Sequence, residues 1–303
     1  MATPVRTLDL NFQGRSHAIA SYLVSHSGGG VLVESGPGST KGALQAALAE
    51  HGLTARDVSH VFLTHIHLDH AGAAGWLARK GAIIHVHPVG APHLLNPEKL
   101  LASAARIYGD QMDTLWGEFL AVPEDKLVIL RDGDEVTVGG LRFTAVDTPG
   151  HAEHHHAYLY EDLCFSGDVG GVRIPGFAYL RLPMPPPELN LERWRASIQR
   201  LRKLKFGRIA PTHFGIYNDP DWHLAMLERC LDDVSRWLED VMPADPAIED
   251  LRARFTAWMD EEASASGLTP GVLAAYSLAN PLGMSADGMQ RYWRKFRVQQ
   301  SKE

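Results

Sequence analysis

Three histidines and one aspartate lie within a span of six residues, at His65, His67, Asp69 and His70. They follow the apolar segment 58–64, which predicts a strand. Alternate residues of a strand share a face, so His65 and His67 can bind one ion, and the next turn can direct Asp69 and His70 toward a second. Imidazole and carboxylate ligands suit zinc, iron or manganese.

Two further histidines and one aspartate follow later strand-like segments. His151 ends the run Asp-Thr-Pro-Gly-His, Asp168 follows Ser-Gly, and His213 lies in the run Pro-Thr-His-Phe-Gly. One histidine or aspartate alone indicates little, so these three residues become candidate ligands only through the resemblance that the whole set carries.

The run from His65 to His70 matches the HxHxDH motif without departure. Together with the later ligands, it resembles the metallo-β-lactamase superfamily over about residues 1–218. The resemblance implies a four-layer αββα sandwich of the α/β class that binds two divalent ions, with zinc expected and iron or manganese as alternatives. It also implies these roles: His65, His67 and His151 on the first ion, Asp69, His70 and His213 on the second, and Asp168 between them.

The expected function is that of a dinuclear metal-dependent hydrolase, with a metal-bridging hydroxide that attacks an ester, lactone, thioester or related small substrate. Asp69 is the expected catalytic residue and would carry a proton to the leaving group. An iron-dependent oxidoreductase of the persulfide dioxygenase type is the alternative, and a phosphodiesterase ranks lower. A scaffold protein of this fold would tend to lose ligands, whereas all seven are present here.

Strand and helix patterns alternate up to about residue 218 and are helical beyond it, which indicates an α/β domain (1–218) and a helical C-terminal region (219–303). Strands are expected at 17–25, 31–34, 58–64, 82–87, 126–130, 135–138, 141–146 and 208–210, with a hairpin at 156–165. Helices are expected at 40–51, 72–80, 191–204, 222–241, 247–262 and 285–296.

Two segments are expected to border the cleft. The helical insertion 88–123 predicts a lid with Tyr108 and Trp116 as an apolar wall, although aromatic residues at this spacing are also typical of a core. The Gly- and Pro-rich loop 170–187 offers Arg173 and Tyr179 as substrate contacts. Arg173 could pair with a substrate carboxylate or phosphate, or it could be an exposed loop residue.

The remaining histidines and one glutamate are ambiguous. The run His154, His155 and His156 could support the ligands or touch substrate, or it could be a histidine-rich turn entering a strand. Structural roles are expected for His85, His87 and His93. Glu34 stands where the superfamily more usually has an aspartate, so we expect it to support the site or the fold.

Composition excludes several partners. The formal net charge is -7 with no long basic run, which argues against nucleic acid. The two cysteines are expected to be reduced thiols, and no apolar stretch suits a membrane span or a secretory signal, so we expect a cytoplasmic protein. The aromatic residues after residue 219 predict that the C-terminal helices cover the cleft or form a homodimer contact. Four basic residues near the end could favour an anionic substrate or an acidic partner surface, or they could form the solvated face of a final helix: Arg291, Arg294, Lys295 and Arg297.

Overall fold

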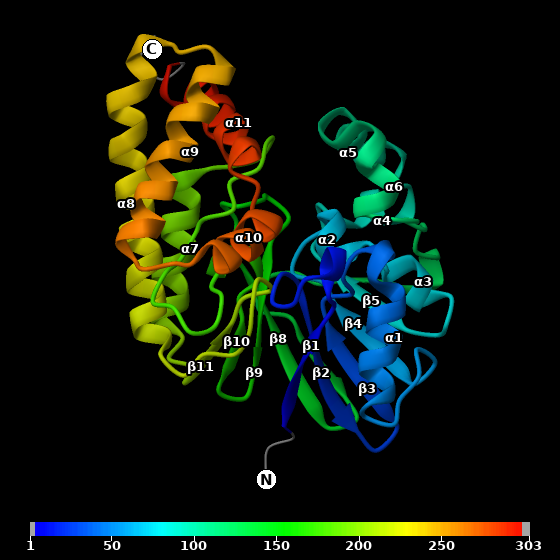
Figure 1. Ribbon diagram of the computed structural model, residues 1–303. Coiled ribbons are helices and arrows are strands. Elements are labelled where there is room, and N and C mark those ends of the chain that lie inside the picture. The colour runs from blue at the N-terminus through cyan, green and yellow to red at the C-terminus, as the bar shows by residue number, and fades with distance from the viewer. Residues whose placement is uncertain (1–3, 299–303) are drawn as a thin grey trace.

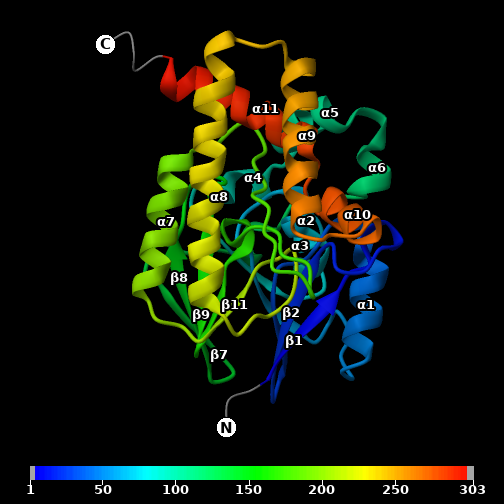
Figure 2. The ribbon, with the colours of Figure 1, turned by 60° about the vertical axis from the view of Figure 1, so that its left-hand side comes forward.

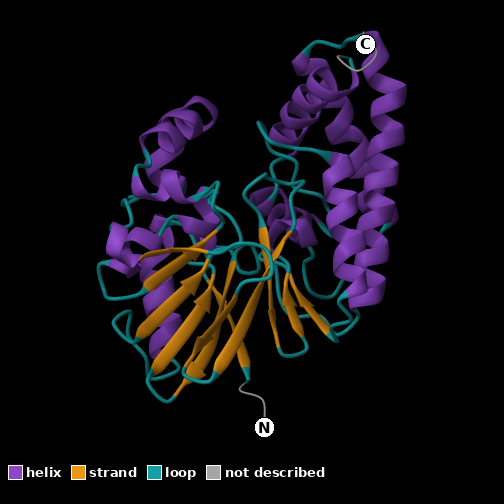
Figure 3. Ribbon diagram, turned by 180° about the vertical axis from the view of Figure 1, so that it is seen from behind, coloured by secondary structure: helices purple, strands orange, loops and turns teal. Residues whose placement is uncertain are grey.

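The computed structural model describes residues 4–298, and it contains two β-sheets that face each other with helices on their outer sides (Figures 1 and 3). This arrangement confirms the predicted αββα sandwich and its helical C-terminal region. None of the described helices is both long and apolar enough to cross a membrane.

The first sheet has six strands in sequence order, and it turns from antiparallel pairing at β1–β3 to parallel pairing at β3–β6. The strands are β1 (Val5–Asp9), β2 (Ala20–His26), β3 (Gly29–Val33), β4 (Val58–Phe62), β5 (Ile83–Val86) and β6 (Leu127–Ile129). The sequence did not predict β1, because it is an edge strand in which Leu8 alone is buried.

The second sheet has five strands in the order β11-β10-β9-β8-β7. They are β7 (Glu135–Val138), β8 (Leu141–Asp147), β9 (His156–Tyr160), β10 (Leu163–Phe165) and β11 (Arg208–Ala210), and β11 pairs parallel to β10. The predicted hairpin of residues 156–165 is the pair β9–β10. Phe62 of the first sheet stacks on Phe143 of the second at 4.6 Å between ring centroids, so the core lies between the two sheets.

Helices cover both outer faces of the sandwich. The first sheet carries α1 (Lys41–Ala49), α2 (Leu68–Ala71) and α3 (Ala74–Ala78), followed by the insertion helices α4 (Ala91–Leu95), α5 (Glu98–Tyr108) and α6 (Met112–Leu115). The second sheet carries α7 (Leu191–Lys203) and α8 (Pro220–Val241), which lie side by side in Figure 2. Asn190 caps α7 by accepting a hydrogen bond from the Arg193 amide at 2.9 Å.

Three more helices complete the C-terminal region: α9 (Ile248–Ala265), α10 (Pro270–Ala279) and α11 (Leu282–Tyr292), followed by a π-helical turn at 293–297. The sequence did not predict α10, because its opening Thr-Pro-Gly is also typical of a turn, whereas here Pro270 is the first residue of the helix. Leu224 and Leu227 of α8 belong to the same continuous core as Trp194 of α7. The C-terminal helices therefore bury their apolar faces against the sandwich.

Candidate metal centre

All seven predicted ligands lie at one edge of the sandwich, in the segments that follow strands. His65 and His67 follow β4, and Asp69 and His70 lie in the short helix α2. The other three come from the second sheet: His151 follows β8, Asp168 follows β10 and His213 follows β11. Because these strands end at a common edge, residues almost 150 positions apart in sequence become neighbours.

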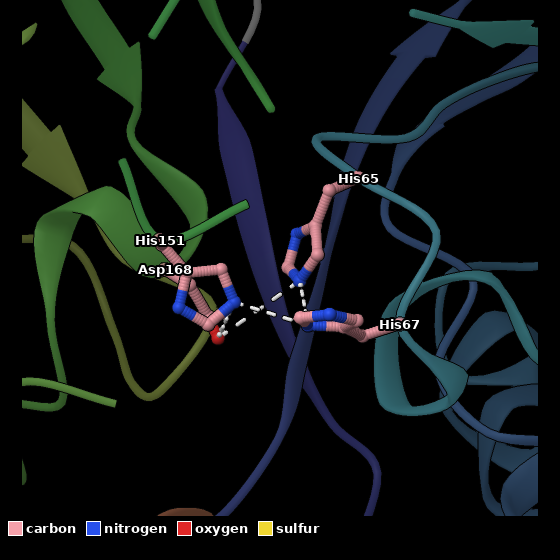
Figure 4. A group of neighbouring side chains, drawn as sticks. All are labelled: His65, His67, His151 and Asp168. Atoms are coloured by element: carbon pink, nitrogen blue, oxygen red, sulfur yellow. Dashed lines mark hydrogen bonds and ion pairs between the residues drawn. The ribbon is translucent and has the colours of Figure 1, made fainter. Parts of the chain in front are cut away.

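The first group of candidate ligands contains three histidines and Asp168 (Figure 4). Nδ1 of His67 lies 2.8 Å from Nε2 of His65 and 3.0 Å from Nε2 of His151. The Asp168 Oδ2 atom lies 3.3 Å from Nε2 of His151 and 4.0 Å from Nε2 of His65. Four ligand atoms are thus gathered around one point.

The second group contains Asp69, His70 and His213. The Asp69 Oδ2 atom lies 3.5 Å from Nε2 of His70 and 3.4 Å from Nε2 of His213. The same two nitrogens each lie 3.3 Å from Oδ1 of Asp168. One oxygen of Asp168 therefore faces each group, which is the geometry of a carboxylate that bridges two cations.

Hydrogen bonds at the far side of the rings orient three of these histidines. Nδ1 of His151 lies 2.8 Å from the Pro183 carbonyl, and Nδ1 of His213 lies 2.7 Å from the Ala18 carbonyl. Each carbonyl accepts a hydrogen bond from the protonated Nδ1, so Nε2 keeps its lone pair directed into the site.

Glu34 does the same for His70 and connects three segments of the site. Its Oε1 atom lies 2.9 Å from Nδ1 of His70 and accepts hydrogen bonds from the hydroxyls of Thr64, at 2.5 Å, and Thr212, at 3.0 Å. Glu34 is fully buried and has a positive φ of 69°. The prediction that Glu34 supports the site agrees with these contacts.

Charge in the centre is shared between the histidines and the carboxylates. Burial opposes a charge on His70, but the nearby Asp69, Asp168 and Glu34 carboxylates raise its pKa well above the usual value. Burial raises the pKa of Asp168, but the surrounding imidazoles, His70 foremost, overcome this effect and hold that pKa below its ordinary value. Burial and the neighbouring His151 lower the pKa of His67 to about 3, which leaves a neutral ring that can bind a metal.

Several buried atoms of the centre have no hydrogen-bond partner among the described residues. They include Nε2 of His70, Nε2 of His213 and Oδ1 of Asp168. Unpaired polar atoms in a protein interior are costly. The two histidine nitrogens each lie 3.3 Å from Oδ1 of Asp168, but neither contact has the geometry of a hydrogen bond. A shared cation satisfies all of them at once, so the residues fit the pair of metal ions that the sequence predicts.

A cavity of about 650 Å³ opens over the centre, with Asp69, His151 and Asp168 among its lining residues. One wall comes from the insertion, through Ile107 and Tyr108 of α5. The other walls come from the C-terminal helices and the proline-rich loop, and their apolar lining residues are Leu278, Ala279, Pro281, Met284, Pro183, Pro185, Pro186 and Pro187. Figure 1 shows α5 and α6 on one side of this edge and α10 and α11 on the other.

The predicted residues of the insertion line the cavity, whereas those of the Gly- and Pro-rich loop do not. Trp116 lines it beside Tyr108, whose hydroxyl contacts the Met284 sulfur at 3.4 Å. Arg173 instead forms a bidentate ion pair with Asp219, in which each terminal guanidinium nitrogen donates to one carboxylate oxygen at 2.8 Å. Its buried guanidinium also packs on the ring of Tyr217 at 3.9 Å, so the structure gives it a structural role in place of the predicted substrate contact.

Tyr179 is likewise absent from the cavity lining. It is buried, its ring packs against Tyr276 at 5.2 Å, and its hydroxyl accepts a hydrogen bond from Arg181 at 3.2 Å. The cavity contacts that the sequence did not indicate come from α10 and α11. Their signal was the aromatic content of the C-terminal region, which predicted a covered cleft but no particular residue.

The three consecutive histidines have three different surroundings. His154 lines the cavity, with Nε2 3.4 Å from Glu188. His155 lies beneath the centre, where Nδ1 is 2.8 Å from the Thr148 hydroxyl. His156 faces away, toward His87. One of the three therefore faces the cleft, as the interpretation of a histidine-rich turn predicted.

Comparison with known proteins identifies the family. The family described as the metallo-beta-lactamase superfamily matches residues 15–213, well over half of the chain, so this protein belongs to that superfamily. The match contains all seven candidate ligands, from His65 to His213.

Individual relatives are more distant. The metallo-beta-lactamase fold-containing protein ST1585 of Sulfurisphaera tokodaii is 29% identical over 52% of this chain and 61% of its own length. The lactamase-like protein vrtG of Penicillium aethiopicum is 30% identical over 64% of this chain and 50% of its own length. An atrochrysone carboxyl ACP thioesterase of Aspergillus fumigatus is 31% identical over 49% of this chain and 39% of its own length. The chain thus matches about two fifths to three fifths of the length of these relatives.

Solved structures support the fold. A metallo-beta-lactamase family protein of Thermus thermophilus, TTHA1429, covers 96% of this chain and 93% of its own, with a TM-score of 0.64 and 23% identity. The ST1585 structure covers 76% and 86%, with a TM-score of 0.59 and 21% identity.

Proposed function

We propose that this protein is a metal-dependent hydrolase that cleaves an ester, thioester or lactone bond in a small substrate with an apolar acyl portion. One observation carries the proposal: seven candidate ligands in two adjoining groups lie at the base of a cavity whose walls are largely apolar. The ligands supply the reaction class, and the walls supply the preference for an apolar substrate.

Two divalent ions held by these ligands would lower the pKa of a bound water and polarise the carbonyl of the substrate. The donor set of imidazoles and carboxylates without thiolate suits zinc, and iron or manganese would also be accepted. Asp168 would balance the charge of both ions.

Asp69 has a second role in the proposal. Its side chain is 18% exposed and lines the cavity, whereas Asp168 is only 4% exposed. Asp69 can therefore reach the substrate and hold the proton that passes to the leaving group. His70 and His213, which contact its Oδ2 atom, fix the carboxylate for that transfer.

The name of one relative also supports a substrate that contains an acyl group. The name of the Aspergillus fumigatus relative describes it as an atrochrysone carboxyl ACP thioesterase, where ACP stands for acyl carrier protein. A thioester has the same carbonyl chemistry as an ester and a weakly basic leaving group, so the same centre can cleave both. We therefore place thioesters beside esters and lactones in the proposed substrate class.

The test is metal analysis of the purified protein followed by a panel of ester, thioester, lactone, phosphodiester and persulfide substrates, with and without oxygen. Two ions per chain and oxygen-independent hydrolysis of acyl substrates are expected. Asp69→Asn should keep most of the metal and lose most of the turnover. Oxygen-dependent turnover of persulfide would favour the oxidoreductase, and turnover of the phosphodiester alone would also refute the proposal. The cytoplasmic location and the homodimer remain predictions.

A further inference from the structure

We propose that a third divalent metal ion binds outside the catalytic cavity, at His87, Asp147 and His156, and that it crosslinks the two sheets. The three side chains each offer one ligand atom, and these atoms lie within 4.8 Å of one another. None of the three residues lines the catalytic cavity, so the site is separate from the two-ion centre.

The closest contact in this group has the spacing of metal ligands. Nε2 of His87 lies 3.2 Å from Oδ1 of Asp147, yet Oδ1 has no hydrogen-bond partner among the described residues. Two ligands at zinc–nitrogen and zinc–oxygen distances are separated by about 3.3 Å in a tetrahedral site. The distance between the two atoms therefore matches that of neighbouring metal ligands, although they form no hydrogen bond.

His156 supplies the second, independent observation. It is fully buried, and neither of its ring nitrogens has a hydrogen-bond partner among the described residues. A buried imidazole with two unpaired nitrogens is costly, because each nitrogen has lost its hydrogen bond to water. Its ring lies 4.6 Å from that of His87 at an angle of 61°, so an ion between the rings would give one nitrogen a partner.

The charges around the group favour a cation. Asp132 and Asp134 lie near enough to His156 to act on its charge, as Asp147 does. Arg200 neutralises one of these carboxylates through its 2.7 Å ion pair with Asp132. The Asp132 side chain also accepts a hydrogen bond from the Asp147 amide at 2.9 Å, which holds the proposed carboxylate ligand in place.

Binding requires one proton shift. The Val89 amide donates to Nδ1 of His87 at 3.1 Å, which leaves the ring proton on Nε2. When Nε2 binds the ion, the proton moves to Nδ1 and the Val89 amide turns to solvent. Val89 is an exposed turn residue, and the proposal requires water to replace this contact.

The position of the group suggests a structural role. His87 follows β5 of the first sheet, whereas Asp147 ends β8 and His156 begins β9 of the second sheet. The insertion that forms one wall of the cavity begins at the next residue after His87. An ion here would join the two sheets and fix the base of that wall. Two histidines and one carboxylate are ligand types that suit zinc, with a water molecule as the fourth ligand.

The experiment is a crystal structure of the full chain grown with zinc, with anomalous data collected on both sides of the zinc absorption edge. Peaks are expected at the two-ion centre and between His87, Asp147 and His156. Asp147→Asn and His87→Gln should each remove the third peak and lower the zinc content from three to two ions per chain. The matched controls, Asp125→Asn and His51→Gln, alter exposed residues and should keep three ions.

The stability of the protein is the second readout. Zinc should raise the Tm of the wild type more than that of Asp147→Asn, while the activity of the two proteins remains equal. A zinc peak at the two-ion centre alone would overturn this inference and leave the proposed function standing. A peak at the third site alone would support the inference and count against the proposed function.

Discussion

The metal centre and the cavity above it are built from different kinds of sequence. The centre draws its seven candidate ligands from short segments that directly follow strands, and each segment is recognisable by residue type and spacing. The cavity walls come from the α5 region and from α10 and α11, which lie about 170 residues apart and contribute mostly apolar side chains. The contrast indicates that the candidate metal ligands and the cavity lining are encoded separately in this chain.

This separation has a physical cause. Metal ligands must be of particular types and meet within a few ångströms, so they leave a strict pattern in the sequence. An apolar wall needs only bulk and shape, which Leu278 or Met284 can supply as well as many other residues. The predictions below test the two regions in turn, from the largest expected effect to the smallest.

The largest effect is expected at the bridging carboxylate. Asp168→Ala should lower turnover by on the order of 10³-fold or more and reduce the bound metal, because two cations would then face each other without the shared negative charge. Activity assays and elemental analysis measure both effects. Asp162→Ala is the control, since Asp162 pairs with Arg208 at the protein surface. Unchanged metal content and unchanged turnover in Asp168→Ala would refute the bridging role.

A smaller effect is expected at the residue that orients a ligand. Glu34→Gln keeps the size of the side chain but removes the charge opposite His70, and it should weaken metal affinity by roughly 10–100-fold. Competition with a chelator measures the affinity, and Glu50→Gln, at an exposed position, is the control. Equal affinities in the two variants would show that the Glu34 charge does not support the centre.

The walls should alter substrate preference without altering metal content. Leu278→Ala removes an apolar side chain from the cavity and should lower kcat/KM for long acyl substrates by about tenfold, with little change for acetyl substrates. Kinetics on an acyl-length series measure the ratio. Leu204→Ala, which shortens a leucine outside the cavity lining, should leave the ratio unchanged. Equal losses for short and long substrates would contradict the role proposed for this wall.

The same contrast describes what the sequence could predict. The αββα fold and strands such as β7 and β11 follow from local patterns and are confirmed, and the structure brings the seven predicted ligands together at one edge. The roles of Arg173 and Tyr179 do not follow, because loop 170–187 turns both side chains toward the C-terminal helices and away from the cavity. Which side of a loop a residue faces depends on packing against distant elements such as Asp219 and Tyr276. Periodicity carries no record of that packing.

The smallest effect is expected in the core between the sheets, away from both regions. Burial lowers the pKa of His85 to about 3, and its ring stacks on Phe62 at 4.4 Å between centroids. The unfolded chain binds a proton on this histidine below about pH 6.5, whereas the folded protein does not, so its contribution to stability is present at neutral pH and is lost as the pH falls. Between pH 7 and 5.5, the loss amounts to about 1 kcal/mol.

His85→Phe keeps an aromatic ring in the stack and removes the titration, so its free energy of unfolding should decline less over this interval. Denaturant unfolding of the metal-free proteins measures the decline, and chelation beforehand keeps metal release out of the comparison. The absolute stability of the variant can shift with packing, but the pH dependence isolates the proton. His51→Gln, at an exposed position, should keep the decline of the wild type. A wild-type decline in His85→Phe would mean that this buried histidine is protonated equally in the folded and unfolded states.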